Sequence, residues 1–264
     1  MESGSGVCGI RETHPRTVIC GISFSCLNRD QASKWLLNSA YELRGGYICV
    51  TGAHGVILAQ DDPEFLSILN SATMNTLDGQ PVVWISRWRG HKSERVTGRE
   101  LLWDTVAQDR DARLTHVLFG STREITDKMI ERLRKFAPTI QVQAFNPPFT
   151  SLIDDELDEI VRGLQFSAPA IIWVGLSTPK QERLAARLAE RLPRSPVVAI
   201  GAGFNFIAGV SPVAPRVITA LGLEWLFRLS CEPRRLYKRY VATVPRFSLL
   251  FVRELLKRSV ESNT

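Results

Sequence analysis

Short, uncharged apolar runs recur along the first 211 residues of the chain and alternate with helical patterns. Five such runs predict strands, at residues 47–51, 115–119, 140–145, 170–174 and 197–200. Continuous apolar runs rich in β-branched residues are typical of strands buried on both faces of a parallel sheet. The alternation therefore predicts an α/β protein with a doubly wound, Rossmann-like parallel-sheet core.

The helices predicted between these strands have clear start and stop signals. Asp62-Pro63-Glu64 opens one helix, because proline is favoured in the first helical turn. Another helix begins near Asp30 and ends at Gly45-Gly46. Residues 121–124 and 178–181 have the spacing of capping boxes. In such a fold, ligands bind at the carboxyl ends of the strands, which is where we expect the functional site.

Residues 195–215 form an uncharged stretch that has the length of a membrane span. It contains three prolines and three glycines, which a lipid-exposed helix does not accommodate. We predict a buried strand followed by a glycine-rich loop. The first fifteen residues lack the apolar segment of a secretory signal, and the five cysteines form no Cys-x-x-Cys pair. These features favour a reducing cytosol.

The net charge of +6 lies entirely in the last fifth of the chain. Residues 212–264 hold ten Lys or Arg against four acidic residues, whereas the other 211 residues hold 23 of each kind. Aromatic and aliphatic residues are interleaved with the basic ones. We predict an N-terminal extension at 1–16, an α/β core at 17–211 and a basic helical appendage at 212–264. Such a segment fits an anionic partner, either a nucleic acid or a membrane surface, and the alternative is a solvated helix surface without a partner.

Spacing alone gives few candidate catalytic groups. Asp109 and Asp111 have the Asp-x-Asp spacing of many metal sites, but they precede a strand and so lie opposite the expected ligand edge; we expect a solvated loop. The four histidines have no metal-ligand spacing. Asp78 fits a helix N-cap as well as a catalytic role, and Gln181 fits a capping box equally well. Thr51 follows a strand directly, at the ligand edge.

The stretch Gly201-Ala-Gly203 follows a predicted strand and matches the first half of a dinucleotide-binding Gly-x-Gly-x-x-Gly motif. Phe206 replaces the third glycine. A nicotinamide-dependent oxidoreductase is one alternative, although it needs the intact motif and an acidic ribose ligand about twenty residues on; Glu224 is the one acid near that position. A nucleic-acid-binding module that uses the basic segment is the other, and it would show strongly salt-dependent binding.

Eight motifs follow one another along the chain. They are Thr51-Gly-Ala-His-Gly-Val-Ile, Asp61-Asp-Pro-Glu, Leu77-Asp-Gly-Gln-Pro-Val-Val-Trp, Glu94-Arg-Val-Thr-Gly, Asn146-Pro-Pro-Phe, Val174-Gly-Leu-Ser-Thr-Pro-Lys-Gln-Glu, Gly201-Ala-Gly-Phe-Asn-Phe-Ile-Ala-Gly, and Gly222-Leu-Glu-Trp-Leu-Phe-Arg with Glu232-Pro-Arg-Arg-Leu. In this order they resemble the WecG/TagA/CpsF family of bacterial glycosyltransferases, from about residue 17 to about residue 250.

The resemblance implies an inverting glycosyltransferase that needs no metal and no cofactor. Such enzymes move a hexose or N-acetylhexosamine-type sugar from a UDP-sugar to a sugar on undecaprenyl diphosphate, for capsular or other surface polysaccharides. It also implies a Rossmann-like core with a C-terminal appendage that reaches an anionic membrane surface. We therefore expect a cytoplasmic protein, peripheral on the inner face of the membrane, without a nucleic-acid partner. A homo-oligomer is compatible with the sequence.

The resemblance assigns roles to three groups of residues. The expected catalytic group is Asp78, as the general base, with Thr51 and Arg95; the expected donor-binding group is Gln181, Asn205, Gly201, Gly203 and Lys180; the expected group for the acceptor diphosphate is Arg228, Arg235 and Lys238. The chain departs from the family pattern at Ala53, where many members have Asn, and at Leu77, where Pro is common. Asn205 replaces the usual Asp and keeps its hydrogen bonds without the charge, which affects the donor more than the reaction.

Overall fold

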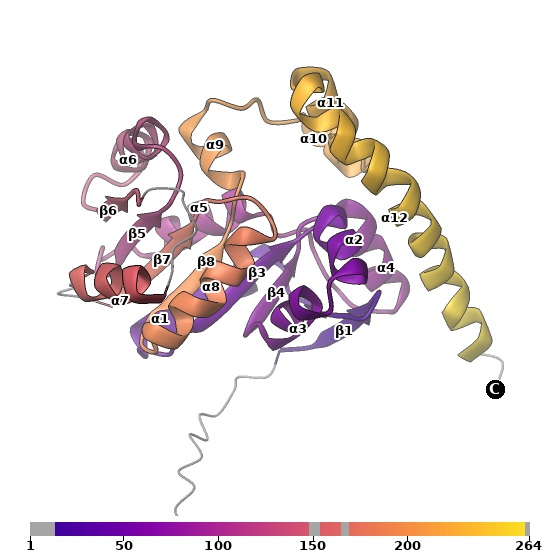
Figure 1. Cartoon of the computed structure of the whole chain (residues 1–264), viewed down its shortest axis with the longest axis horizontal. Coiled ribbons are helices and arrows are strands. Elements are labelled where there is room, and N and C mark those ends of the chain that lie inside the picture. Colours follow the sequence, from indigo (N-terminus) through magenta and orange to yellow (C-terminus); the bar gives the residue numbers. More distant parts are fainter. Residues whose placement is uncertain (1–13, 148–153, 165–168, 262–264) are drawn as a thin grey trace, which may run out of the picture.

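The structure is a computed structural model that describes residues 14–147, 154–164 and 169–261 (Figure 1). The predicted absence of a secretory signal concerns the first fifteen residues, and residues 1–13 lie outside the described part. The same holds for most of the N-terminal extension and for Pro148 and Phe149 of the fifth motif.

A six-stranded parallel sheet forms the centre of the protein, in the order β4-β3-β8-β7-β5-β6. Its strands are β3 (Gly46–Thr51), β4 (Met74–Leu77), β5 (Thr115–Phe119), β6 (Gln141–Phe145), β7 (Ala170–Val174) and β8 (Pro196–Ala199). The pairing brings their carboxyl ends together: Thr51 lies opposite Leu77, and Val174 opposite both Phe119 and Ala199. The predicted Rossmann-like core is confirmed.

Helices cover both faces of this sheet, because successive side chains of its strands point to opposite sides. Ile171 and Trp173 join one buried cluster, whereas Ile172 and Val174 join another. The helices of the first face are α1 (Arg29–Tyr41), α5 (Gly98–Gln108), α6 (Arg123–Phe136) and α9 (Gly203–Ala208). Those of the second are α2 (Ala53–Asp61), α3 (Pro63–Ser71), α4 (Gln80–Trp88), α7 (Asp154–Gly163) and α8 (Lys180–Arg191).

Several predicted helix starts need correction. Helix α6 is capped by Thr122, whose side chain accepts the backbone N–H of Ile125, and not by Ser121. Helix α8 has Pro179 at its N-cap position, with no side-chain capping bond, so Thr178 does not begin a capping box. The predicted glycine-rich loop after β8 contains the short helix α9 instead. The predicted cap at Asp62 is confirmed, since its carboxylate accepts the N–H of Phe65.

The C-terminal segment is helical, as predicted, and consists of α10 (Arg216–Ala220), α11 (Glu224–Cys231) and α12 (Pro233–Glu261). Helix α12 runs along α2 and α4 on one side of the core (Figure 1). Phe247 is buried in the cluster formed by α2, α3 and α4. Two ion pairs, Arg246 with Asp61 and Arg89 with Glu254, join the same surfaces. No helix in the described ranges is both long enough and apolar enough to cross a membrane.

Candidate functional site

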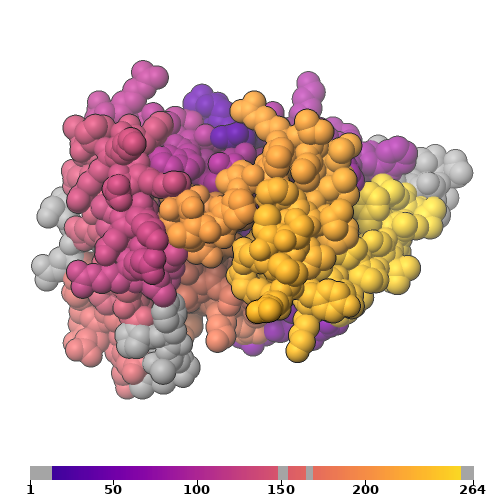
Figure 2. All heavy atoms as spheres, turned by 90° about the horizontal axis from the view of Figure 1, so that it is seen from above, coloured from indigo at the N-terminus to yellow at the C-terminus, as the bar shows by residue number. Residues whose placement is uncertain are grey.

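A cavity of about 1610 Å³ lies at the carboxyl edge of the sheet. Residues that end or follow β3, β4, β5, β7 and β8 line it, so the predicted ligand edge is indeed hollow. The appendage supplies the opposite wall through residues of α11 and α12. Figure 2 shows the appendage, orange to yellow, lying across the core from above. The site is therefore built from both the core and the appendage.

Asp78 stands at the end of β4 and faces this cavity. Its backbone N–H donates to the carbonyl oxygen of Thr51 at 3.2 Å, which ties the ends of β3 and β4 together. The N-cap of α4 is Gly79 and has no side-chain capping bond. The prediction that Asp78 could serve as an N-cap is therefore wrong, and Asp78 lines the cavity instead.

Arg95 is held beside Asp78 by the segment that follows α4. Val96 donates its N–H to the carbonyl oxygen of Leu77 at 3.0 Å and accepts the Thr76 hydroxyl at 3.0 Å. This pairing brings Nε of Arg95 to 2.8 Å from the main-chain oxygen of Asp78. The Nη2 atom of Arg95 lies 3.8 Å from Oδ1 of Asp78, beyond hydrogen-bond distance.

The position of Asp78 changes its acidity. Partial desolvation in the cavity, where 37% of the side chain stays exposed, raises the pKa of Asp78 to about 7, against the opposing effect of the Arg95 guanidinium. Nearby Glu224 adds to the increase, and Arg228 reduces it. A carboxylate with a pKa near neutrality is a competent general base at physiological pH.

Gln181 and Gly201 meet on the core side of the cavity. Gln181 is 4% exposed and donates from Nε2 to Glu182 at 2.8 Å. Gly201 has φ +50°, and a Cβ atom there would lie 2.6 Å from Oε1 of Gln181. Glycine is thus required at this turn. Gly203, Asn205 and Lys180 line the same cavity, so the structure brings together all five predicted donor residues.

The cavity lining contains buried polar atoms that have no hydrogen-bond partner among the described residues. They are Oγ1 of Thr51, Oε1 of Gln181, Oε2 of Glu182, Nε of Arg228 and Nε of Arg239. Buried polar groups destabilise a fold when they are left unpaired. Acceptors on the core side and cationic donors on the appendage side suit a ligand rich in hydroxyl groups and negative charge.

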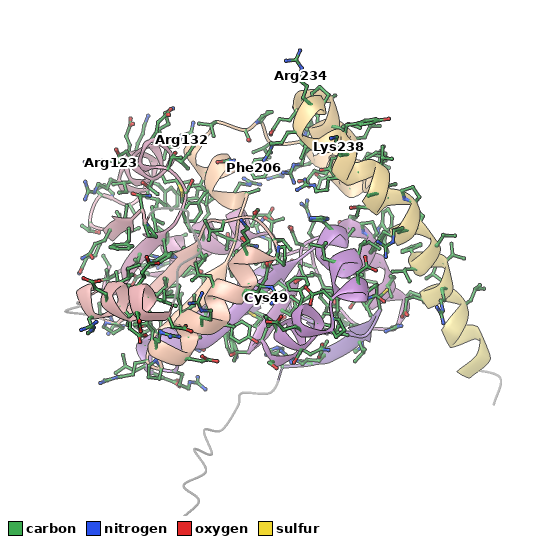
Figure 3. All side chains as sticks on the ribbon, in the orientation of Figure 1. Cys49, Arg123, Arg132, Phe206, Arg234 and Lys238 are labelled. Carbon is green, nitrogen blue, oxygen red and sulfur yellow. The ribbon has the colours of Figure 1, made fainter. Side chains whose placement is uncertain are left out.

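The appendage residues are only partly where the sequence places them. Arg228 and Arg235 line the cavity, and the Arg228 guanidinium lies over the Phe206 ring, 5.2 Å from its centre. Lys238 is exposed and does not line the cavity; Figure 3 labels it on α12. Arg239 lines the cavity instead. The sequence signal for Arg239 is its helical spacing from Arg235. Residues four apart share a helix face, and Arg235 is four residues earlier.

His54 lies between core and appendage near this arginine. Its Nδ1 atom is 3.4 Å from the hydroxyl of Thr243 on α12. Burial, together with the charge of Arg239, lowers the pKa of His54 to about 4. His54 is therefore neutral at physiological pH and adds no positive charge to the cavity.

The Asp-x-Asp pair lies away from the cavity, but it is not a solvated loop. Asp109 is buried and accepts hydrogen bonds from the Tyr41 hydroxyl at 2.5 Å and from the N–H groups of Arg113 and Leu114. Asp111 is exposed. The expectation for Asp109 was wrong because three donors surround its carboxylate at the start of β5. Within the described ranges, no three His, Cys, Asp or Glu side chains are grouped to hold a metal.

The carboxyl edge of this open α/β sheet holds a carboxylate of raised pKa, Asp78, among several arginines. This arrangement is typical of group-transfer enzymes that act on anionic substrates. The chain belongs to the glycosyl transferase WecG/TagA/CpsF family, whose model matches residues 17–261, and it is a glycosyltransferase. The predicted family resemblance is confirmed.

Two curated relatives are N-acetylglucosaminyldiphosphoundecaprenol N-acetyl-beta-D-mannosaminyltransferases. The protein from Bacillus spizizenii (strain ATCC 23059 / NRRL B-14472 / W23) is 22% identical over 205 residues, which is 77% of each chain. The protein from Bacillus subtilis (strain 168) is 21% identical over 211 residues, which is 80% of each chain.

Proposed function

We propose that this glycosyltransferase moves an N-acetylhexosamine-type sugar from a UDP-sugar to the sugar of an undecaprenyl-diphosphate acceptor, with inversion and without a metal. The observation that carries the proposal is the placement of the Asp78 carboxylate in one cavity with Arg95, Arg228 and Arg235. The names of the two Bacillus relatives support N-acetylmannosamine as the first donor sugar to test. The product would serve a surface polysaccharide.

In this mechanism Asp78 removes the proton from the acceptor hydroxyl. The resulting oxygen attacks the anomeric carbon of the donor as the bond to the nucleotide diphosphate breaks, so a single displacement inverts the configuration. The Oγ1 atom of Thr51, buried at the adjacent strand end without a partner, is available to hold a substrate hydroxyl. General-base catalysis of this kind contributes about 10²- to 10⁴-fold to the rate.

The leaving diphosphate gains negative charge as the bond breaks, and cationic groups must stabilise it. Arg95 and Lys180 line the cavity from the core side. The turn at Gly201 lets backbone approach a phosphate or a ribose closely, because no Cβ atom intervenes. Neutral Asn205 would contact the donor through hydrogen bonds alone.

Arg228 and Arg235 would hold the acceptor diphosphate from the appendage side. The appendage carries large exposed apolar residues, which include Val217, Leu221, Leu226, Tyr237, Val241, Leu249, Val252 and Leu256. Exposed Arg234 and Lys238 lie among them. Apolar side chains interleaved with cations favour binding to an anionic membrane surface, which would bring the cavity to its lipid substrate.

A donor screen tests the proposed function directly. Purified full-length protein is incubated with a short-chain lipid-diphosphate N-acetylglucosamine acceptor and with UDP-linked N-acetylmannosamine, N-acetylglucosamine or glucose, and products are identified by mass spectrometry. We expect transfer from an N-acetylhexosamine donor. Transfer of no sugar, or thermal stabilisation by NAD and not by UDP, would contradict the proposal and favour the oxidoreductase alternative.

Metal removal gives a second test. We expect the transfer rate in excess EDTA to stay within twofold of the untreated rate, because Arg95 and Lys180 supply the positive charge at the leaving group and Asp109 is bonded internally. The measurement compares initial rates with EDTA and with added Mg²⁺ or Mn²⁺. A rate that collapses in EDTA and returns with either ion would show that the reaction needs a metal.

The acidity of Asp78 gives a third test, in the pH profile. Asp78 must be ionised to act as a base, and its pKa is raised to about 7. We therefore expect kcat/KM to fall about tenfold per pH unit below pH 7 and to level off above it. Measured initial rates between pH 5 and 9 check this. An acidic limb near pH 4, the ordinary range of a carboxyl, would contradict the assigned base.

A further inference from the structure

The turn before α11 fits closely against the helix that follows Asp78. Gly222 has φ +73°, and a Cβ atom there would lie 2.8 Å from Cη2 of Trp84. Trp84 belongs to α4, which begins two residues after Asp78. This contact lies two residues before Glu224, the first residue of α11.

Glu224 pairs with the arginine that lies beside the catalytic carboxylate. Oε2 of Glu224 is 2.5 Å from Nη2 of Arg95. The same guanidinium donates from Nε to the main-chain oxygen of Asp78 at 2.8 Å. With these two contacts made, Nη2 stays 3.8 Å from the side-chain Oδ1 of Asp78. Arg95 therefore bonds to the backbone of Asp78 and to the side chain of Glu224. Its distance to the Asp78 carboxylate stays too long for a hydrogen bond.

We infer that Glu224 is a positioning residue, which draws the Arg95 guanidinium away from the Asp78 carboxylate and so keeps that carboxylate free to accept the proton of the sugar hydroxyl. The inference rests on the proposed role of Asp78 as the base. Because Glu224 comes from the appendage, the base is complete only when the appendage is seated on the core. The wall that would bind the lipid diphosphate thereby controls the chemistry at the other end of the cavity.

The charges around Asp78 agree with this role. Arg95 and Arg228 lower the pKa of Asp78, whereas Glu224 and Glu100 raise it. Loss of the Glu224 charge removes one group that raises the pKa of Asp78. It also frees Nη2 of Arg95 to form a direct ion pair with Asp78, which lowers that pKa further. Both effects have the same sign and weaken the base.

The test is Glu224→Gln in the full chain. We expect the acidic limb of the kcat profile to move about one pH unit toward acid, and kcat above pH 8 to fall about tenfold, with the donor KM within threefold of wild type. Glu224→Asp should recover part of the shift, because it restores the charge. Arg246→Gln is the matched control: it breaks another ion pair of the appendage, with Asp61, and should leave the limb in place.

A readout without substrate separates this inference from the proposed function. The ¹³C signal of the Asp78 carboxyl, assigned by its loss in Asp78→Asn, should titrate at lower pH in Glu224→Gln than in wild type. An unchanged titration, or an equal shift in Arg246→Gln, would overturn the role of Glu224 even if the wild type turns over. Absence of sugar transfer by the wild type would instead refute the proposed function, while the titration still decides on Glu224.

Discussion

Substituting Asp78 by Asn is expected to lower kcat about 10²- to 10⁴-fold, the usual contribution of a general base. The asparagine side chain has nearly the same shape, and its oxygen still accepts a hydrogen bond, but it cannot take up the proton. Because Asp78 acts on the acceptor hydroxyl in the proposed mechanism, UDP should bind with an affinity within about threefold of wild type. Single-turnover transfer and UDP titration measure the two quantities separately.

The thermal stability of the same variant tests for a purely structural role. The pKa of Asp78 is about 7 in the folded protein, above the ordinary range of an aspartate. Folding therefore disfavours the ionised carboxylate, and this destabilisation is largest above pH 7. We expect the Tm of Asp78→Asn at pH 8 to be equal to or higher than that of wild type. Asp111→Asn, at an exposed site outside the cavity, is the matched control, and turnover of Asp78→Asn within threefold of this control would contradict the assignment.

The sheet was predictable where its strands are continuously apolar, as in β7, whose predicted and observed bounds coincide. Strand β4 is equally buried, yet its central residues are Asn75 and Thr76. Hydropathy alone therefore gives no run there. The hairpin of β1 (Arg16–Ile19) and β2 (Ile22–Ser25) was also missed, since strands of four residues are too short for a periodic signal.

The core side of the site was predictable for a topological reason. Parallel strands place the residues that follow them at one edge, so Thr51 and Gly201 had to come together once their strands were recognised. Asp78 follows β4, which hydropathy does not predict, and it was expected in the site from the family resemblance alone. The appendage side of the site was not predictable from the sequence, because it depends on how α11 and α12 pack on the core. Helical spacing places Arg239 on the face of Arg235, but it does not reveal that this face lines the cavity, or that Glu224 reaches Arg95.

Replacing Arg228 and Arg235 together by Gln is expected to lower kcat/KM for the lipid-diphosphate acceptor about 10²-fold or more. Each hydrogen bond between an arginine and a phosphate contributes about 1.5–3 kcal/mol, and about 1.4 kcal/mol corresponds to a factor of ten. Both side chains line the cavity. Glutamine retains hydrogen-bonding capacity and much of the side-chain volume, so the loss would report on charge. Kinetics with a short-chain acceptor at saturating donor measure it.

The matched control removes two charges from α12 that do not line the cavity. Arg234 and Lys238 are exposed and lie outside the cavity lining (Figure 3). Because each cation near an anionic surface contributes about 1 kcal/mol, Arg234→Gln with Lys238→Gln should weaken sedimentation with phosphatidylglycerol vesicles about tenfold or more. Turnover of the short-chain acceptor should stay within threefold, because that acceptor needs no membrane. If both double variants lost turnover equally, the cavity-lining cations of α11 and α12 and the exposed cations of α12 would not have separate roles, and the placement of the lipid diphosphate in the cavity would be wrong.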